Sequence, residues 1–199
     1  MVKPSAPILA PGPRPPLSVE VVAPALLDTP LEYILADHVR QRSICAALQE
    51  FADKAEAPRL EADKVCAFLG HDRLIHHADE DQDLFPILRR RMRPEDNLGP
   101  VLERLSDDHR RSDLIAADII AALSVNPASD PLPIRPAAAR AMRRYVADEQ
   151  RHLAIENGVV MVIAAIRLAP RDLRAISGKM KARRGLIPVS QNSDLSAKR

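Results

Sequence analysis

Prolines divide this chain into four long stretches, and each stretch carries the apolar periodicity of a helix. Pro30, Pro58 and Pro136 stand where a stretch begins, and proline is well tolerated in the first turn of a helix. Pro94 and Pro170 follow the end of a stretch, where proline stops a helix. Inside the stretches, apolar residues recur three and four positions apart, as on one buried helix face. The pattern predicts helices over about residues 30–54, 58–92, 98–124 and 136–168.

Four helices of this length, joined mostly by short connections, predict an all-α fold, an antiparallel up-down four-helix bundle. The chain has only 6 glycines and few β-branched or aromatic runs, which argues against an all-β fold or a glycine-rich phosphate-binding fold. The length of 199 residues fits one domain with tails. We expect a Pro-rich extension over residues 1–29, the bundle over 30–170, and a basic, disordered tail over 171–199.

The start of the first helix has a clear local signal. Thr29 is placed to cap the helix, and Glu32 is placed to close a capping box with it. The preceding Pro-rich segment lacks helical periodicity and is expected to be extended or disordered, with Val22 and Leu27 among the residues able to dock on the core.

Charge and composition limit the class of partner. Residues 171–199 carry eight Lys or Arg against two acidic residues, and we interpret this tail as a solvated end that leaves room for an unidentified protein partner. Aromatic residues make up 3% of the chain and Trp is absent, which argues against the stacking platforms of nucleic-acid-binding proteins. The chain contains no run of 18 apolar residues, so no membrane-spanning helix is predicted. The two cysteines do not form the kind of disulfide framework found in secreted proteins. We therefore expect the protein to reside in a reducing compartment, the cytoplasm.

Each predicted helix places one histidine in its apolar stripe, and two of these histidines have a glutamate one turn later. The histidines are His38, His76, His109 and His152, and the glutamates are Glu80 and Glu156. The spacing i, i+4 brings the two side chains of each His–Glu pair onto one helix face. Six metal-binding groups therefore point into the expected core.

A metal centre accounts for such a set better than chance does. A single histidine on a helix face is usually structural, but buried imidazoles and carboxylates in this number are costly without a compensating charge. Imidazole with carboxylate suits iron or manganese, and zinc is a further candidate. Because a carboxylate has two oxygens, Glu80 and Glu156 could each bridge two ions in a dinuclear site.

These segments resemble the hemerythrin-like, or HHE cation-binding, family over about residues 30–168. The most specific match is the run HHADEDQDLFP at residues 76–86, and LADHVRQR, DHRR and HLAIENGVV match the other three helices. The resemblance implies a four-helix bundle around two non-haem iron ions, with manganese or zinc as weaker candidates. It implies the ligand set His38, His76, Glu80, His109, His152 and Glu156. Members of the family bind oxygen, or sense or respond to oxygen, iron, nitric oxide or peroxide.

One position departs from the oxygen-carrying members of the family. Those proteins have a second histidine four residues after the third-helix ligand, where this chain has Asp113. The change leaves a vacant or weakly bound coordination position, or lets Asp113 serve as a ligand. The resemblance therefore implies sensing, stress response or detoxification with oxygen, nitric oxide or peroxide as ligand, rather than simple reversible oxygen carriage.

The roles of two residues near the candidate ligands, and two alternative functions, remain open at this point. His77 points about 100° away from His76 and is expected not to bind metal. Glu149 could accept a hydrogen bond from His152 or could be a boundary charge. The alternatives to a gas-binding protein are a di-iron oxidase or peroxidase and a metal-free helical interaction module. No serine-protease-like triad or phosphate loop is visible, so no catalytic residue is assigned.

Overall fold

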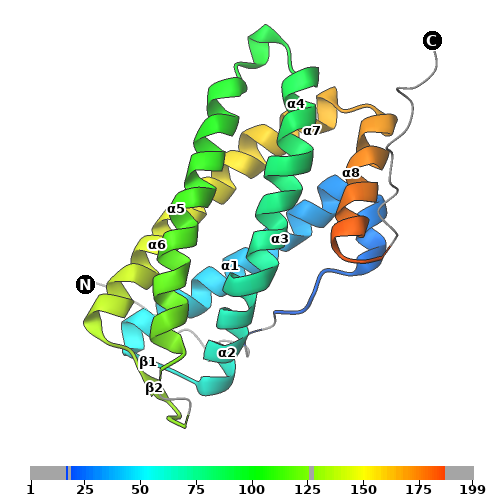
Figure 1. Ribbon diagram of the computed structural model, residues 1–199. Helices are drawn as coiled ribbons and strands as arrows, with labels where there is room; N and C mark the ends of the chain where they lie inside the picture. Colours follow the sequence, from blue (N-terminus) through cyan, green and yellow to red (C-terminus); the bar gives the residue numbers. More distant parts are fainter. Residues whose placement is uncertain (1–16, 18, 126–127, 187–199) are drawn as a thin grey trace, which may run out of the picture.

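The computed structural model describes residues 17, 19–125 and 128–186, and it is mostly helical. Figure 1 shows long helical rods that lie side by side. The first rod is α1 (Pro30–Lys54) and the third is α5 (Gly99–Leu123). Helix α6 (Pro136–Ile155) packs against both of these helices. Each of the other two rods consists of several helical segments in direct succession.

The second and fourth rods contain wide turns of π-helix between their α-helical segments. The second rod is α2 (Arg59–Ala67), η2 (Phe68–Asp72), α3 (Arg73–Ala78), η3 (Asp79–Leu84) and α4 (Phe85–Arg91). The fourth rod is α6 (Pro136–Ile155), η5 (Glu156–Val160) and α7 (Met161–Arg167). The segments η2, η3 and η5 are the π-helical ones. Turns of this kind inside α-helices are found frequently at functional sites.

The predicted helix boundaries agree with these rods to within one or two residues. The predicted cap at Thr29 is wrong, because its hydroxyl donates a hydrogen bond backwards to the carbonyl of Leu26 and caps no helical N–H group. Pro86 is the second residue of α4 and lies in its first turn, where its missing N–H group is tolerated.

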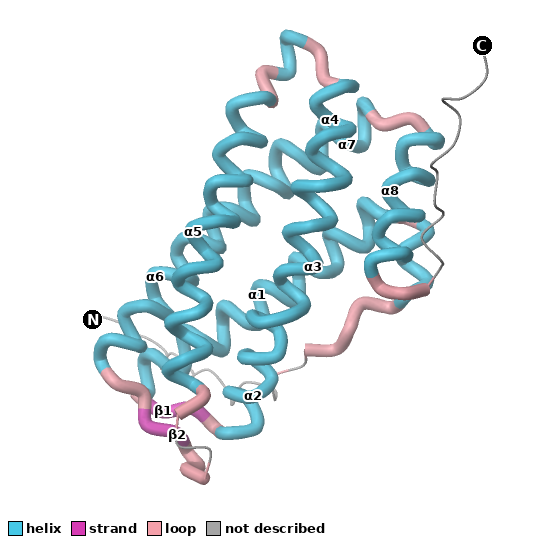
Figure 2. Tube along the Cα trace, in the orientation of Figure 1, coloured by secondary structure: helices cyan, strands magenta, loops and turns pink. Residues whose placement is uncertain are grey.

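Short elements close the ends of the rods. Strands β1 (Glu56–Ala57) and β2 (Leu132–Pro133) form a small antiparallel pair that joins the two connections at one end (Figure 2). The 3₁₀-helix η4 (Pro94–Asp96) lies in the connection before α5. The 3₁₀-helix η1 (Pro24–Asp28) precedes α1 and buries Leu27 completely, as expected for a docking residue.

The apolar core has two parts. One part lies towards the β1–β2 end and includes Leu48, Phe51, Phe68, Ile119 and Met142. The other lies towards the α4–α5 connection and includes Ile34, Leu84, Leu88, Leu102 and Val160. In α1, His38 lies in the sequence between residues of the two parts. A belt of buried polar residues thus divides the core, and this belt contains the six predicted ligands.

The basic segment after the fourth rod is not the disordered tail that we expected over its first part. Residues Pro170–Arg183 form helix α8, and Ile176 and Met180 on its inner face are fully buried. Arg183 and Arg184 form ion pairs with Asp79, which is itself almost fully buried in η3. The positive charge therefore has acidic partners on the second rod. Residues 187–199 and 1–16 lie outside the described residues.

No helix among the described residues is long and apolar enough to cross a membrane.

Candidate metal centre

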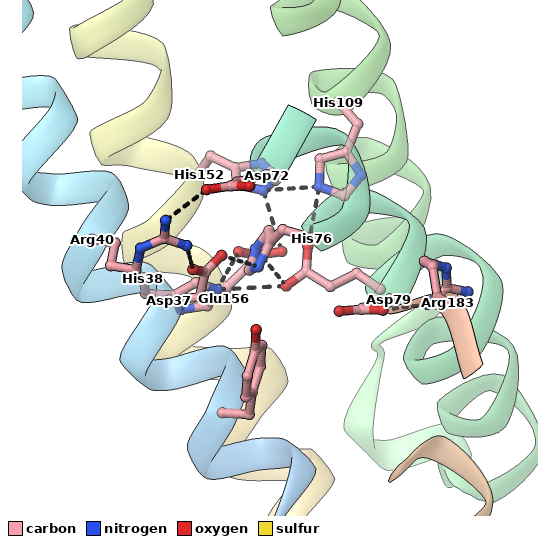
Figure 3. Close-up of polar contacts among 12 residues, drawn as sticks. Asp37, His38, Arg40, Asp72, His76, Asp79, His109, His152, Glu156 and Arg183 are labelled. Atoms are coloured by element: carbon pink, nitrogen blue, oxygen red, sulfur yellow. Dashed lines mark hydrogen bonds and ion pairs between the residues drawn. The ribbon is translucent and has the colours of Figure 1, made fainter. Parts of the chain in front are cut away.

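The structure brings all six predicted ligand residues together in the middle of the bundle. One histidine comes from α1, one from α3, one from α5 and one from α6, while the glutamates come from the π-turns η3 and η5. All six side chains are buried, with at most 5% of their surface exposed. Figure 3 shows the imidazoles converging on the space between the rods.

The six residues form two groups that share the two glutamates. His38 and His76 join Glu80 and Glu156 in one group, and His109 and His152 join the same glutamates in the other. Within each group one potential ligand atom per residue lies within 4.8 Å of all the others. Metal–ligand bonds of about 2.0–2.2 Å fit such spacings.

Each glutamate directs one oxygen to each group. Oε1 of Glu80 lies 3.5 Å from Nε2 of His38 and 3.3 Å from Nε2 of His76, while its Oε2 lies 3.3 Å from Nε2 of His109. Oε2 of Glu156 lies 3.3 Å from Nε2 of His38, and its Oε1 lies 3.2 Å from Nε2 of His152. A carboxylate with its two oxygens in different ligand sets has the arrangement of a bridge between two ions.

Several of these atoms are buried without a hydrogen bond of acceptable geometry among the described residues. They are Nε2 of His38, Nε2 of His76, Oε2 of Glu80 and both carboxylate oxygens of Glu156. A buried polar atom without a partner costs about 1–3 kcal/mol, and more when it is charged. The affected atoms all face one another and all have lone pairs suited to a cation. The residues present therefore fit a bound metal.

The outward nitrogens of three histidines are held by acceptors on other residues. Nδ1 of His38 lies 2.8 Å from Oδ1 of Asn157, and Nδ1 of His76 lies 3.1 Å from Oδ2 of Asp37. Nδ1 of His109 lies 2.8 Å from Oδ2 of Asp81. An acceptor at Nδ1 keeps the proton there and leaves Nε2, the inward nitrogen, free to bind metal.

Sequence reasoning assigned no role to Asp81 or Asn157. Asp81 directly follows Glu80, and Asn157 directly follows Glu156. Each lies in a π-turn and reaches a histidine on a different rod. The available signal was a polar residue immediately after each glutamate of the His–Glu pairs.

Electrostatics in the cluster favour a positive charge at its centre. Burial disfavours the charged imidazole of His76, but the negative charge of Glu80 and the hydrogen bond to Asp37 outweigh it and raise the pKa of His76 well above its usual value. Burial likewise opposes ionisation of Glu80, yet the positive charge of His76 brings the pKa of Glu80 well below its usual value. Protons on the imidazoles here supply the positive charge that a cation would otherwise supply, and metal binding must displace them.

Asp113 lies outside both groups of potential ligands. Its Oδ1 lies 2.5 Å from Nη1 of Arg73, a buried side chain that also donates a hydrogen bond to the hydroxyl of Ser112. Hydrogen bonding to His77, then the interaction with Arg73, lowers the pKa of Asp113 to about 2. Asp113 is therefore an ionised partner of Arg73 in this structure.

His77 is buried but belongs to neither group. Its ring stacks on that of His109, with centroids 4.0 Å apart and an angle of 15° between the planes. Burial lowers the pKa of His77 to about 3, so the ring is neutral. His77 thus packs against a histidine of the cluster.

The hydrogen bond considered between Glu149 and His152 is not formed. Nδ1 of His152 and Oε1 of Glu149 are both buried without a hydrogen-bond partner among the described residues. Burial raises the pKa of Glu149. Glu149 instead lines a pocket next to His109 and His152.

Comparison with known proteins gives one positive result. No curated protein matches the sequence. The model of the family described as the hemerythrin HHE cation binding domain matches residues 29–163, which contain all six residues of the cluster. The chain belongs to the family of hemerythrin HHE cation-binding domains.

Proposed function

We propose that the protein is a non-haem di-iron protein that binds a small ligand, either oxygen, nitric oxide or peroxide. In this proposal, His38 and His76 hold one ion, His109 and His152 hold the other, and the two glutamates bridge them. The observation that carries the proposal is the division of each glutamate between the two groups, one oxygen to each. We also infer that the four rods form an antiparallel up-down four-helix bundle around this centre.

Iron in such a site supplies one-electron redox chemistry and a coordination position for a small ligand. The chain's own residues prepare the site for it. Asn157, Asp37 and Asp81 fix the outward nitrogen of three histidines, so the inward nitrogen is the one that would bind the ion once its proton is displaced. The apolar core on both sides excludes water and strengthens every charge interaction in the belt.

Each group has two histidines, and we place ligand binding in the second group because position 113 supplies no further ligand to it. Asp113, which occupies the position of a further histidine in oxygen carriers, is engaged by Arg73. The proposed role is therefore sensing, stress response or detoxification rather than storage of oxygen. The proposed setting is the cytoplasm, which the two free cysteines, Cys45 and Cys66, support.

Two alternatives differ in what they require. A di-iron oxidase or peroxidase would use the same six residues and would turn over an added substrate. A metal-free interaction module would leave the buried polar atoms of the cluster without partners, and each such atom costs stability. A protein partner bound through the terminal segments is a further proposal, and it concerns residues outside those described.

The deciding experiment measures metal content and absorption of the full chain produced with iron and purified without chelator. We expect two iron ions per chain, one for each group, with charge-transfer absorption that changes on adding azide. A colour that forms with oxygen, disappears when oxygen is removed and forms again when oxygen is added would indicate carriage and contradict the sensing role. Sustained consumption of peroxide would identify the enzyme. A colourless, metal-free and well-folded protein would refute the di-iron proposal.

A further inference from the structure

A pocket of about 240 Å³ lies between α5 and α6 and reaches one side of the ligand cluster. His109 and His152 form part of its wall, and they are the members of the cluster that it reaches. His38 and His76, in the other group, are not among its lining residues. A water molecule occupies about 30 Å³ in the liquid, so this pocket has room for a small hydrated solute. The pocket therefore serves the second ligand group selectively.

The rim of the pocket carries two sets of arginine–aspartate–arginine, one on each helix. The sets are Arg104, Asp108 and Arg111 on α5, and Arg144, Asp148 and Arg151 on α6. In each set both arginines form ion pairs with the one aspartate, so each set has a net charge of +1. The arginine side chains are 58–69% exposed, which places them at the mouth rather than in the depth of the pocket.

The depth of the pocket is polar. Tyr145 and Glu149 line it and are almost fully buried, and Ser112 adds a hydroxyl. Burial raises the pKa of Glu149. A solute that enters thus passes a positive mouth and then meets hydroxyl, carboxyl and imidazole groups.

We propose that this pocket is the entry and binding site for a small inorganic anion, and that the two arginine sets attract it from solution. The chemical class is a singly charged anion of two to four atoms, such as azide, nitrite or hydroperoxide. A cleft lined by one sign of charge raises the local concentration of the opposite ion and its association rate, and salt screens this effect. Delivery to iron rests on the proposed function, but attraction of the anion to the mouth does not.

The first test uses azide as the probe and the iron-loaded protein. The double variant Arg144→Gln/Arg151→Gln brings the net charge of the mouth from +2 to 0, because it removes two of four arginines that face Asp108 and Asp148. We expect the association rate constant of azide, followed by stopped-flow absorption, to fall about threefold to tenfold at low ionic strength. The difference should shrink at high ionic strength.

A matched control separates the effect of the arginines at the mouth from the effect of the protein's overall net charge. Arg110→Gln/Arg140→Gln removes two exposed arginines from the same two helices, and neither residue lines the pocket. The control should keep the wild-type rate. Equal slowing in both variants, or no slowing in either, would overturn the proposal.

The second test uses the metal-free protein, so that failure of the iron assignment can be told apart. Titration with azide, followed by NMR of the arginine side-chain N–H groups, should shift the signals of the four mouth arginines and leave those of Arg110 and Arg140 unchanged. Shifts spread evenly over all exposed arginines would refute the anion site whatever the iron content is. If the shifts are localised to the four mouth arginines and the protein also fails to take up iron when iron is supplied, the anion site would stand and the di-iron function would be refuted.

Discussion

Asp81 and Asn157 have equivalent positions, each one residue after a cluster glutamate and each 2.8 Å from the outward nitrogen of a histidine on another rod. Asp81 holds His109 on α5, and Asn157 holds His38 on α1. A π-turn thus contributes a cluster glutamate and, at the next position, an acceptor that orients a histidine of the cluster. The two halves of the site are built on the same local plan.

Removing one of these acceptors should weaken metal binding without unfolding the protein. For Asp81→Asn we expect metal affinity to fall about 10- to 100-fold, because the negative charge that holds Nδ1 of His109 is lost. Competition with a chelator of known affinity measures the change. Asp107→Asn on the exposed face of α5 is the control and should leave affinity unchanged. Equal affinity of Asp81→Asn and the wild type would show that this contact has no orienting role.

Replacing a glutamate of the proposed bridge should largely remove the stabilisation that metal binding gives the fold. Glu80→Gln replaces a carboxylate whose two oxygens face different groups, so we expect loss of at least one of the two ions. The rise in Tm that iron gives the wild type should largely disappear, since metal binding stabilises only the folded site. Glu103→Gln, on the exposed surface of α5, is the control. Full iron content and an unchanged Tm rise in Glu80→Gln would contradict the bridging assignment.

Helix α8 should depend on its two contacts with Asp79. In Arg183→Ala/Arg184→Ala the carboxylate of Asp79, only 1% exposed, loses both arginine partners. Leaving a buried charge without its partner costs about 3–5 kcal/mol, which urea unfolding measures as a lower free energy of unfolding.

Two further variants show whether Asp79 is the cause. Adding Asp79→Asn to the double variant should restore part of the lost free energy, because the unpaired charge is removed. Arg171→Ala/Arg174→Ala removes two exposed arginines of α8 and should change little. If that control is as destabilising as the first pair, helix propensity or net charge, and not Asp79, explains the loss.

The ion pair between Asp96 and Arg167 should give a defined pH dependence of stability. The carboxylate of Asp96 accepts hydrogen bonds from Arg167 and from the backbone of Arg93, and these lower the pKa of Asp96 to about 2 from an ordinary value of 3.8. A group whose pKa is lower in the folded protein stabilises the fold at pH values above its ordinary, unfolded-state pKa. This stabilisation is lost as the pH falls from the unfolded-state pKa to the folded-state pKa. The difference in Tm between the wild type and Asp96→Asn should be constant above pH 4 and close towards pH 2. A difference that stays constant down to pH 2 would exclude this pair as the cause.

Helix periodicity and residue chemistry allowed much of this fold to be predicted. The i, i+4 spacing of His76 and Glu80 requires only that the chain be helical at that point, and it is. The resemblance of the same segments pointed to the family, and the family match confirms it. The assignment of the six residues as metal ligands stays a prediction, although the structure brings them together.

Other features depended on contacts that no local pattern contains. Asp81 and Asn157 would lie about 100° from the preceding glutamate on a regular helix, so periodicity placed them off the site. Helix α8 was missed because its arginines looked like a solvated run, while their partner Asp79 lies about a hundred residues earlier. The interaction of Asp113 with Arg73 likewise joins two rods.

The π-turns η3 and η5 indicate where the length of the second and fourth rods can vary. In each turn the carbonyl of the cluster glutamate accepts a hydrogen bond from the N–H group five residues later, at Phe85 and at Met161. Each π-turn thus holds one residue more than an α-turn, so deleting one residue from it would leave regular α-helix with the rest of the rod in place. The same deletion in α3 or α6 would rotate the following residues by about 100° and move Leu84 and Leu88, or Val160 and Ala164, out of the core. Within these two rods, relatives of this chain should therefore vary in length at the π-turns and keep a fixed length in the α-helical segments.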